Sequence, residues 1–256
     1  MAVLTIDNLS KSFGGIKAVT DINMMIDKGD IVGLIGPNGA GKTTFFNLLT
    51  GMYTPTSGKI CFEDSHLNNL KPYKITDYGI ARTFQNIRLF KNMTVIENVT
   101  LGFHKNIKYG LLASFFKLPS FYKEEKRIYN EALELLKKFG LDHKKDELAK
   151  NLPYGEQRRL EIVRALASKP SLLLLDEPAA GMNPNETREL MELIRWIKDN
   201  YELTIILIEH DMSLVMNICN KLSVLDYGTL IAEGEPKSVI NNPRVIEAYL
   251  GRNAAC

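Results

Sequence analysis

Short apolar runs alternate with longer segments of helical spacing along most of the chain. The runs are rich in β-branched residues, and several are almost continuously apolar, which is typical of strands buried on both faces. The predicted strands are Val3–Ile6, Ile31–Ile35, Lys59–Phe62, Leu172–Leu175, Thr204–Ile208, Leu222–Asp226 and Thr229–Glu233.

The segments between these strands carry apolar residues at helical spacing, and the predicted helices are Thr43–Leu49, Lys123–Phe139, Gln157–Ala167 and Glu186–Asn200. Strands and helices that alternate around buried strands predict an α/β sheet with helices on both sides. The range 86–158 breaks this alternation and is mostly helical in pattern, so we expect an inserted helical subdomain. Within it, we expect the charged stretch Lys123–Arg127 to form a solvated helix face.

Length and composition limit the classes of protein to which the chain can belong. At roughly 100–200 residues per domain, 256 residues make one or two domains, and 45% apolar with 24% charged residues is ordinary for a globular protein. A net charge of +2 lacks the basic excess of nucleic-acid binding, so we expect no nucleic-acid partner. Three widely spaced cysteines form no metal or disulfide pattern, which indicates a reducing compartment: Cys61, Cys219 and Cys256.

The chain shows no membrane-spanning pattern of its own. No apolar run approaches the ~18 residues that a span needs. The N-terminus also lacks the basic start and apolar core of a signal peptide. We therefore expect a cytoplasmic protein that serves a membrane, if at all, through a partner.

A phosphate-binding loop follows the second predicted strand. Its residues match G-x-x-x-x-G-K-[ST] and are Gly36, Pro37, Asn38, Gly39, Ala40, Gly41, Lys42 and Thr43. Glycines let backbone N–H groups turn toward phosphate oxygens, and the helix that follows adds its positive end. We expect Lys42 to reach the β- and γ-phosphates and Thr43 to bind Mg²⁺, with Thr44 completing the cofactor-binding set.

Two carboxylates end the apolar strand Leu172–Leu175. We expect Asp176 to contact Mg²⁺, directly or through water, and Glu177 to orient or deprotonate the attacking water. A dinucleotide-binding fold is excluded because G-x-G-x-x-G is absent. A GTPase would need Asn-Lys-x-Asp, whereas the segment 220–223 ends in Ser223, and no arginine-rich lid of a small-molecule kinase is visible.

With these motifs the chain resembles the ATP-binding subunits of ABC transporters over residues 3–251. The segment that begins at Gly155 and Glu156 resembles the family's signature, and Gln85 resembles the glutamine that joins Mg²⁺ or water to the membrane partner. His210 resembles the switch histidine that contacts the γ-phosphate, and Phe13 lies where the family stacks an aromatic ring on adenine. The resemblance implies catalytic roles for Lys42, Gln85, Glu177 and His210.

Finer features resemble the ATPases of branched-chain amino-acid importers. They are the segments 176–184, 208–212 and 242–251, and the insertion near 105–125 favours the LivG type over the shorter LivF type. Two positions depart from the general family pattern. Pro153 replaces the signature serine, which removes a hydroxyl donor to the partner's ATP, and Asn183 replaces an aspartate.

The resemblance implies a single ABC ATPase domain over 1–256. It would have a P-loop NTPase (RecA-like) core with a small N-terminal antiparallel β-subdomain over about 1–85 and 159–240. A helical subdomain would cover about 86–158 and a C-terminal tail helix about 241–256. ATP would close a head-to-tail dimer and hydrolysis would reopen it. The alternative is a soluble ABC ATPase that acts on nucleic acid or ribosomes.

The implied partners are two membrane permease subunits and, indirectly, an extracytoplasmic amino-acid-binding protein. A second ATPase of LivF type, or a second copy of this chain, would complete the dimer at the inner face of the cell membrane. Aromatic, leucine and lysine residues crowd residues 103–126. Two interpretations stay open for them: a surface that docks a permease helix, or the small core of the insertion itself.

Overall fold

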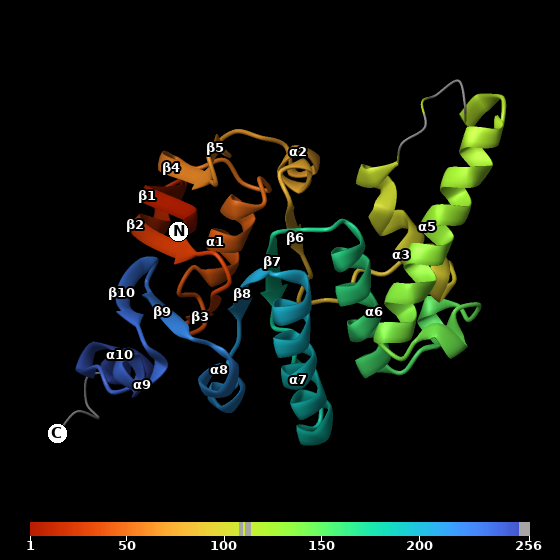
Figure 1. Ribbon diagram of the computed structural model, residues 1–256. Helices are drawn as coiled ribbons and strands as arrows, with labels where there is room; N and C mark the ends of the chain where they lie inside the picture. Colours follow the sequence, from red (N-terminus) through yellow and green to blue (C-terminus); the bar gives the residue numbers. More distant parts are fainter. Residues whose placement is uncertain (108–109, 111–113, 251–256) are drawn as a thin grey trace. The chain divides into compact units, whose positions relative to one another are not determined.

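The computed structural model describes residues 1–107, 110 and 114–250 (Figure 1). The chain divides into two compact units. One comprises Met1–Arg82 and Ser171–Cys256 and is called the α/β unit here, and the other, Thr83–Pro170, is called the helical unit. The helical unit thus extends beyond the range 86–158 at both ends.

A six-stranded sheet forms the centre of the α/β unit, in the order β10-β9-β3-β8-β7-β6. Its strands are β3 (Ile31–Ile35), β6 (Ile80–Arg82), β7 (Leu172–Asp176), β8 (Thr204–Ile208), β9 (Lys221–Asp226) and β10 (Thr229–Gly234). All neighbours are parallel except β10, which runs antiparallel to β9. Every residue of β3, β7 and β8 is buried, as their apolar runs predicted.

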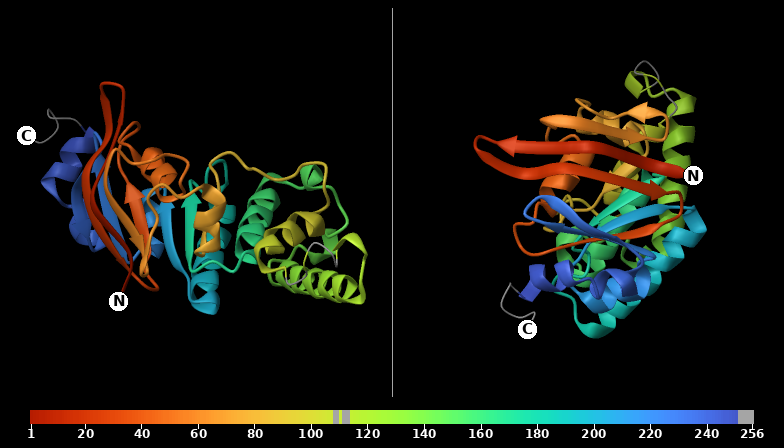
Figure 2. Two further views of the ribbon diagram at one scale, coloured as in Figure 1. Left: turned by 90° about the horizontal axis from the view of Figure 1, so that it is seen from above. Right: turned by 90° about the vertical axis from the view of Figure 1, so that its left-hand side faces the viewer.

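A smaller antiparallel sheet, in the order β2-β1-β4-β5, also belongs to the α/β unit (Figure 2). Its strands are β1 (Ala2–Phe13), β2 (Ile16–Asp27), β4 (Ser57–Phe62) and β5 (Ser65–His66). The predicted fold class is therefore confirmed. Strand β2 was missed because only alternate residues, Ile22, Met24 and Ile26, are buried, so its apolar run is broken.

Helix α1 (Lys42–Leu49) packs into the core that the two sheets share. Its Phe45, Phe46 and Leu49 are buried with residues from both sheets, among them Ile6, Ile22, Leu34, Leu174 and Ile206. Gly33 faces the opposite side of β3, where a Cβ would lie 3.2 Å from Val215 of α8 (Met212–Ile218). Helix α7 (Pro184–Tyr201) packs beside α8, so helices cover both faces of the sheet as predicted.

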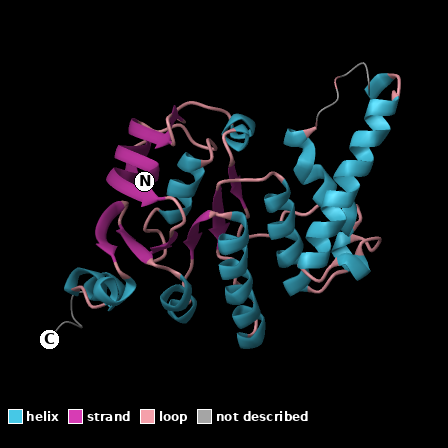
Figure 3. Cartoon of the chain, in the orientation of Figure 1, coloured by secondary structure: helices cyan, strands magenta, loops and turns pink. Residues whose placement is uncertain are grey.

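The helical unit is built on α3 (Val95–Gly102), α5 (Pro119–Lys138) and α6 (Tyr154–Ala167), shown in Figure 3. Among the described residues of this unit, 3-10 turns lie at Phe103–Asn106, Asp142–Lys144 and Ala149–Asn151. The apolar stripe predicted on α5 is buried, with Ile128 at 4% exposure and Ala132 and Leu136 at 0%.

The prediction that Lys123–Arg127 forms a solvated helix face is wrong for Glu124. This carboxylate is only 9% exposed and accepts hydrogen bonds from Arg127 at 2.9 and 2.7 Å. The ion pair with Arg127 offsets the free-energy cost of burying the Glu124 charge. Sequence periodicity alone does not reveal such a pair.

Three small helices complete the α/β unit: α2 (Pro72–Asp77), α9 (Pro236–Ile240) and α10 (Pro243–Leu250). Helix α10 covers part of the predicted tail helix, and residues 251–256 lie outside the described residues. Within the described ranges, no helix combines the length and the apolar character needed to cross a lipid bilayer.

Candidate active site

The loop from β3 to α1 contains three glycines, Gly36, Gly39 and Gly41, in a positive-φ conformation that other residues adopt only with strain. Gly36 has φ 148° and Gly41 has φ 99°. A Cβ would lie 2.1 Å from Leu225 O at Gly36 and 2.4 Å from Ala18 O at Gly41. Both the conformation and the close neighbours therefore exclude a side chain, as expected for a loop that wraps a phosphate.

Helix α1 begins at Lys42 without a side-chain cap. The first N–H groups of a helix have no acceptor within the helix, and the helix dipole places partial positive charge there. The loop and this helix start together form a site for an anion, which is the chemistry that a nucleotide phosphate requires.

The Lys42 ammonium is buried in the loop, with 6% of the residue exposed. Nζ donates to Gly36 O at 2.7 Å and to Pro37 O at 2.9 Å. Burial lowers the pKa of Lys42, and the nearby carboxylates of Glu177 and Asp176 partly offset this effect. A bound phosphate would supply further negative charge that stabilises this ammonium.

A cavity of about 400 Å³ brings most of the predicted site residues together. It is lined by the loop and helix residues Asn38, Gly39, Ala40, Gly41, Lys42, Thr43 and Thr44, and by Glu177 and His210. Ile16, Lys17, Ala18, Tyr227 and Gly228 complete the lining. The catalytic pair predicted from β7 and β8 therefore faces the predicted phosphate loop across one cavity.

Glu177 and His210 contact each other within this cavity, where Glu177 Oε1 lies 2.9 Å from His210 Nε2. Glu177 holds a left-handed backbone conformation, with φ 46°, and its N–H donates to Ile208 O at 2.9 Å. Strained residues other than glycine cluster at functional sites, although others in this structure, such as Asn8 and Glu202, also have positive φ. The Glu177 carboxylate lies next to His210, which the resemblance predicts to be the switch histidine.

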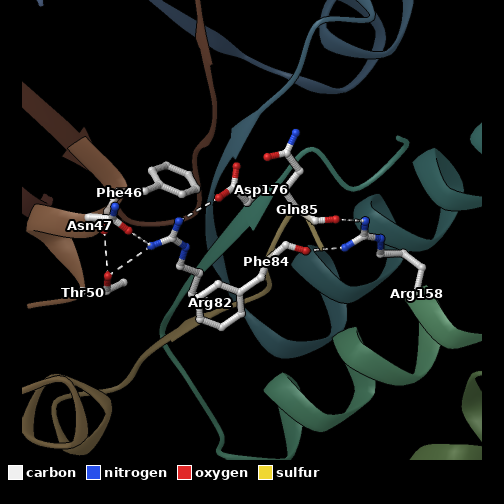
Figure 4. Close-up of polar contacts among 8 residues, drawn as sticks. All are labelled: Phe46, Asn47, Thr50, Arg82, Phe84, Gln85, Arg158 and Asp176. Atoms are coloured by element: carbon white, nitrogen blue, oxygen red, sulfur yellow. Dashed lines mark hydrogen bonds and ion pairs between the residues drawn. The ribbon is translucent and has the colours of Figure 1, made fainter. Parts of the chain in front are cut away.

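Asp176 ends β7 and forms a buried ion pair that the sequence analysis did not anticipate. Its Oδ2 accepts from Arg82 NH2 at 2.7 Å, and the two side chains are 5% and 6% exposed (Figure 4). Arg82 ends β6, a strand too short for its apolar pattern to be recognised. The signal available in the sequence was its position three residues before Gln85.

Glu209 is a second residue that the sequence analysis left without a role. It is 4% exposed and accepts from the N–H groups of Ala179 at 2.8 Å and His210 at 3.2 Å. Burial raises the pKa of its carboxyl, although the backbone hydrogen bonds act in the opposite direction. Glu209 thereby ties the chain after Glu177 to the chain that carries His210.

Phe13 lies at the end of the β1–β2 hairpin, where it pairs with Ile16. Its ring is edge-on to Tyr53, at 5.1 Å between centroids, and the residue is 42% exposed. Ile16, at the same end of the hairpin, lines the cavity described above, whereas Phe13 does not. The adenine-stacking role of Phe13 stays a prediction.

The predicted site residues Gln85, Gly155 and Glu156 belong to the helical unit. The fully buried Arg158 of α6 donates to Phe84 O at 2.6 Å and to Gln85 O at 2.8 Å (Figure 4). Helix α6 therefore holds the backbone at Gln85. Glu156 is held by Lys144, whose Nζ lies 2.8 and 2.7 Å from its two carboxylate oxygens.

Comparison with known families gives two matches. Residues 19–180 match the model described as "ABC transporter". Residues 229–255 match the model described as "Branched-chain amino acid ATP-binding cassette transporter".

Similar proteins extend this likeness over the whole chain. The chain is 48% identical to the high-affinity branched-chain amino acid transport ATP-binding protein LivG of Escherichia coli K12, over 97% of this chain and 98% of that protein. It is 43% identical to BraF of Pseudomonas aeruginosa, with the same coverage. A crystal structure of a nucleotide-free ATP-binding cassette from an ABC transporter is similar at TM-score 0.85 and 34% identity, over 98% of this chain and 100% of that one. Nothing in these likenesses favours the nucleic-acid or ribosome alternative.

Proposed function

This chain belongs to the ATP-binding subunits of ABC transporters, as its motifs predicted, and on that premise we propose that it powers the import of branched-chain amino acids. The observation that carries its ATPase role is the single cavity in which the phosphate loop, Glu177 and His210 meet. The amino-acid class is supported by the similarity of residues 229–255 and by relatives such as LivG and BraF.

In this proposal the phosphate loop binds the β- and γ-phosphates of ATP. Lys42 exchanges the carbonyl oxygens of Gly36 and Pro37 for phosphate oxygens, and the α1 N–H groups bind further phosphate oxygens. Phe13 stacks on the adenine.

The Thr43 hydroxyl in the cavity and the Asp176 carboxylate near Lys42 fit Mg²⁺, which prefers oxygen ligands. Thr43, Asp176 and Gln85 are the residues that would hold it. When bound, Mg²⁺ neutralises the charge that develops on the phosphates. One oxygen of the Asp176 carboxylate already accepts a hydrogen bond from Arg82, so Asp176 is suited to contact Mg²⁺ through a water molecule.

Hydrolysis is assigned to Glu177 and His210. Glu177 takes a proton from water while the water oxygen bonds to the γ-phosphorus and the bond to the β–γ bridging oxygen breaks. His210, 2.9 Å from Glu177, contacts the γ-phosphate and keeps the carboxylate directed toward it. ADP and phosphate are the products.

The second half of each ATP site comes from a partner ATPase, of LivF type or a second copy of this chain. The start of α6, at Gly155 and Glu156, would contact the partner's ATP. Two membrane permease subunits would receive the resulting motion at the inner face of the cell membrane. An external amino-acid-binding protein would deliver the substrate.

The segment 103–126 supports a permease contact in part. Phe115 and Phe116 are 82% and 65% exposed, whereas Phe103 is buried at 1% and belongs to the core of the helical unit. Tyr109, Leu111 and other residues of this segment lie outside the described residues. Among the described residues of the segment, this exposed pair is available for docking, as are Leu118 and Tyr122.

Affinity capture from detergent-solubilised membranes tests the proposal. We expect two permease subunits and a second ATPase to be captured with this chain, and leucine, isoleucine or valine on the binding protein to stimulate ATPase activity in proteoliposomes. Replacing Phe115 and Phe116 by Ser should weaken capture without lowering the melting temperature, whereas Phe103→Ser should lower the melting temperature. Capture of ribosomes, or stimulation by none of these amino acids, would contradict the proposal.

A further inference from the structure

Arg82 connects three parts of the α/β unit through one buried guanidinium. NH2 donates to Asp176 Oδ2 at 2.7 Å, and NH1 donates to Asn47 Oδ1 at 2.7 Å and to Thr50 Oγ1 at 3.3 Å. The guanidinium carbon lies 5.4 Å from the centre of the Phe46 ring. Asn47 is on α1, and Thr50 caps its C-terminal end, so Arg82 joins the last residue of β7 to the helix that begins at the phosphate loop (Figure 4).

The ion pair occupies one oxygen of Asp176 and directs the other away from the guanidinium (Figure 4). Arg82 and Asp176 come from neighbouring parallel strands, since Arg82 is opposite Leu174 in the register of β6 and β7. A planar guanidinium can hold a carboxylate and two further acceptors in one fixed geometry, which an ammonium group cannot do.

We infer that Arg82 is a positioning residue for the magnesium site: it fixes Asp176 relative to the helix that carries Thr43, so that one carboxylate oxygen stays available to the metal. This inference rests on the proposed role of Asp176 toward Mg²⁺. In this role Arg82 acts on the metal through Asp176 and is not itself a ligand of the metal. Groups that orient metal ligands in this way typically change metal affinity by about 10–100-fold when they are replaced.

The test is the dissociation constant of a non-hydrolysable ATP analogue, measured in EDTA and in excess Mg²⁺. The dissociation constant in EDTA divided by the dissociation constant in excess Mg²⁺ gives the gain in affinity that the metal provides. Arg82→Lys keeps the charge and loses the three-way bridge. We expect this ratio to fall about tenfold or more, with the constant in EDTA unchanged because the phosphate loop is intact. Arg195→Lys is the matched control, since Arg195 donates to Asn217 O on α8, and its ratio should not change.

A double-mutant cycle separates this inference from the proposed function. In an Asp176→Asn background, Arg82→Lys should have no further effect on the ratio. If Asp176→Asn alone leaves the ratio unchanged, the metal role of Asp176 is wrong, and this inference fails with it. If Asp176→Asn lowers the ratio but Arg82→Lys leaves it unchanged, for example by raising both dissociation constants by the same factor, only the role of Arg82 is wrong. Should Arg82→Lys unfold, Asn47→Ala, which removes one of the other acceptors, should lower the ratio by a smaller factor.

Discussion

The phosphate loop of the α/β unit and the signature start of the helical unit differ in how completely each is built. At the loop, Gly36 and Gly41 have no room for a Cβ, Lys42 is buried, and Glu177 and His210 complete the cavity. At the signature, α6 begins after Pro153 without a side-chain cap, and Tyr154 is 45% exposed.

Backbone geometry and buried charge therefore determine the loop, whereas the signature start offers only the N–H groups of an exposed helix end. The inner side of α6 is different again, because Arg158 there is fully buried and holds the backbone at Gln85. The exposed start lacks a hydroxyl at Pro153, whereas on the buried side of the same helix both terminal nitrogens of Arg158 donate hydrogen bonds. We therefore expect the chain to hold its own ATP well and to contribute weakly to a partner's.

Removing Arg158 should have the largest effect on stability. Arg158→Met leaves Glu161, which is 1% exposed and accepts from Arg158 NH1 at 2.9 Å, as a buried charge without its cation. Breaking such a pair costs about 3–5 kcal/mol of unfolding free energy. Denaturant unfolding measures it, with the partly exposed neighbour Arg159→Met as the control. If the two variants lose equal unfolding free energy, the buried contacts of Arg158 contribute no more to stability than the partly exposed Arg159 does.

Restoring the signature hydroxyl should have an intermediate effect. In a Glu177→Gln background, Pro153→Ser should strengthen ATP-dependent dimerisation, because a hydrogen bond to a charged group is worth ~1.5–3 kcal/mol. That range corresponds to about ten- to a hundredfold in affinity. Sedimentation velocity at saturating ATP measures the monomer fraction. Pro153→Ala is the matched control, since it restores the N–H alone. If monomer persists equally in all three proteins, the missing hydroxyl does not limit dimerisation, and a LivF-type partner becomes the better candidate.

The smallest effect concerns the buried Glu209, which accepts a hydrogen bond from the His210 N–H. Burial raises its pKa above 4.5, so the folded protein binds more protons than the unfolded chain between pH 4.5 and the folded-state pKa. Its contribution to stability is therefore fully present below pH 4.5 and is lost as the pH rises through the folded-state pKa. Thermal unfolding from pH 4.5 to 8 should show the wild type losing stability relative to Glu209→Gln as the pH rises. A difference that is independent of pH would contradict this account.

Sequence patterns predicted those parts of the molecule whose pattern lies within a short stretch of the chain. The apolar runs of β3, β7 and β8 and the phosphate-loop motif each have a short-range pattern, and the structure contains all four. Strand β2 alternates buried and exposed residues, and β6 has only three residues, so neither gives a continuous run.

The missed site residues depend on contacts between distant segments. Arg82 meets Asp176 across 94 positions of sequence, and Glu209 meets Ala179 across 30. A charged side chain near the end of a strand does not by itself indicate whether it is buried with a partner. Only the fold brings these pairs together, and for that reason the buried polar contacts around Asp176 and Glu177 could not be predicted.

The central claim is that one cavity binds ATP through the phosphate loop and hydrolyses it through Glu177. The most direct test compares ATP affinity with the rate of hydrolysis in Glu177→Gln and Lys42→Ala. Glu177→Gln should keep the wild-type affinity, lower the rate by about 10²–10⁴-fold, and accumulate an ATP-bound dimer. Lys42→Ala should instead lose affinity, with Lys59→Ala, an exposed lysine on β4, as the control. Wild-type turnover in Glu177→Gln, or wild-type affinity in Lys42→Ala, would contradict the account.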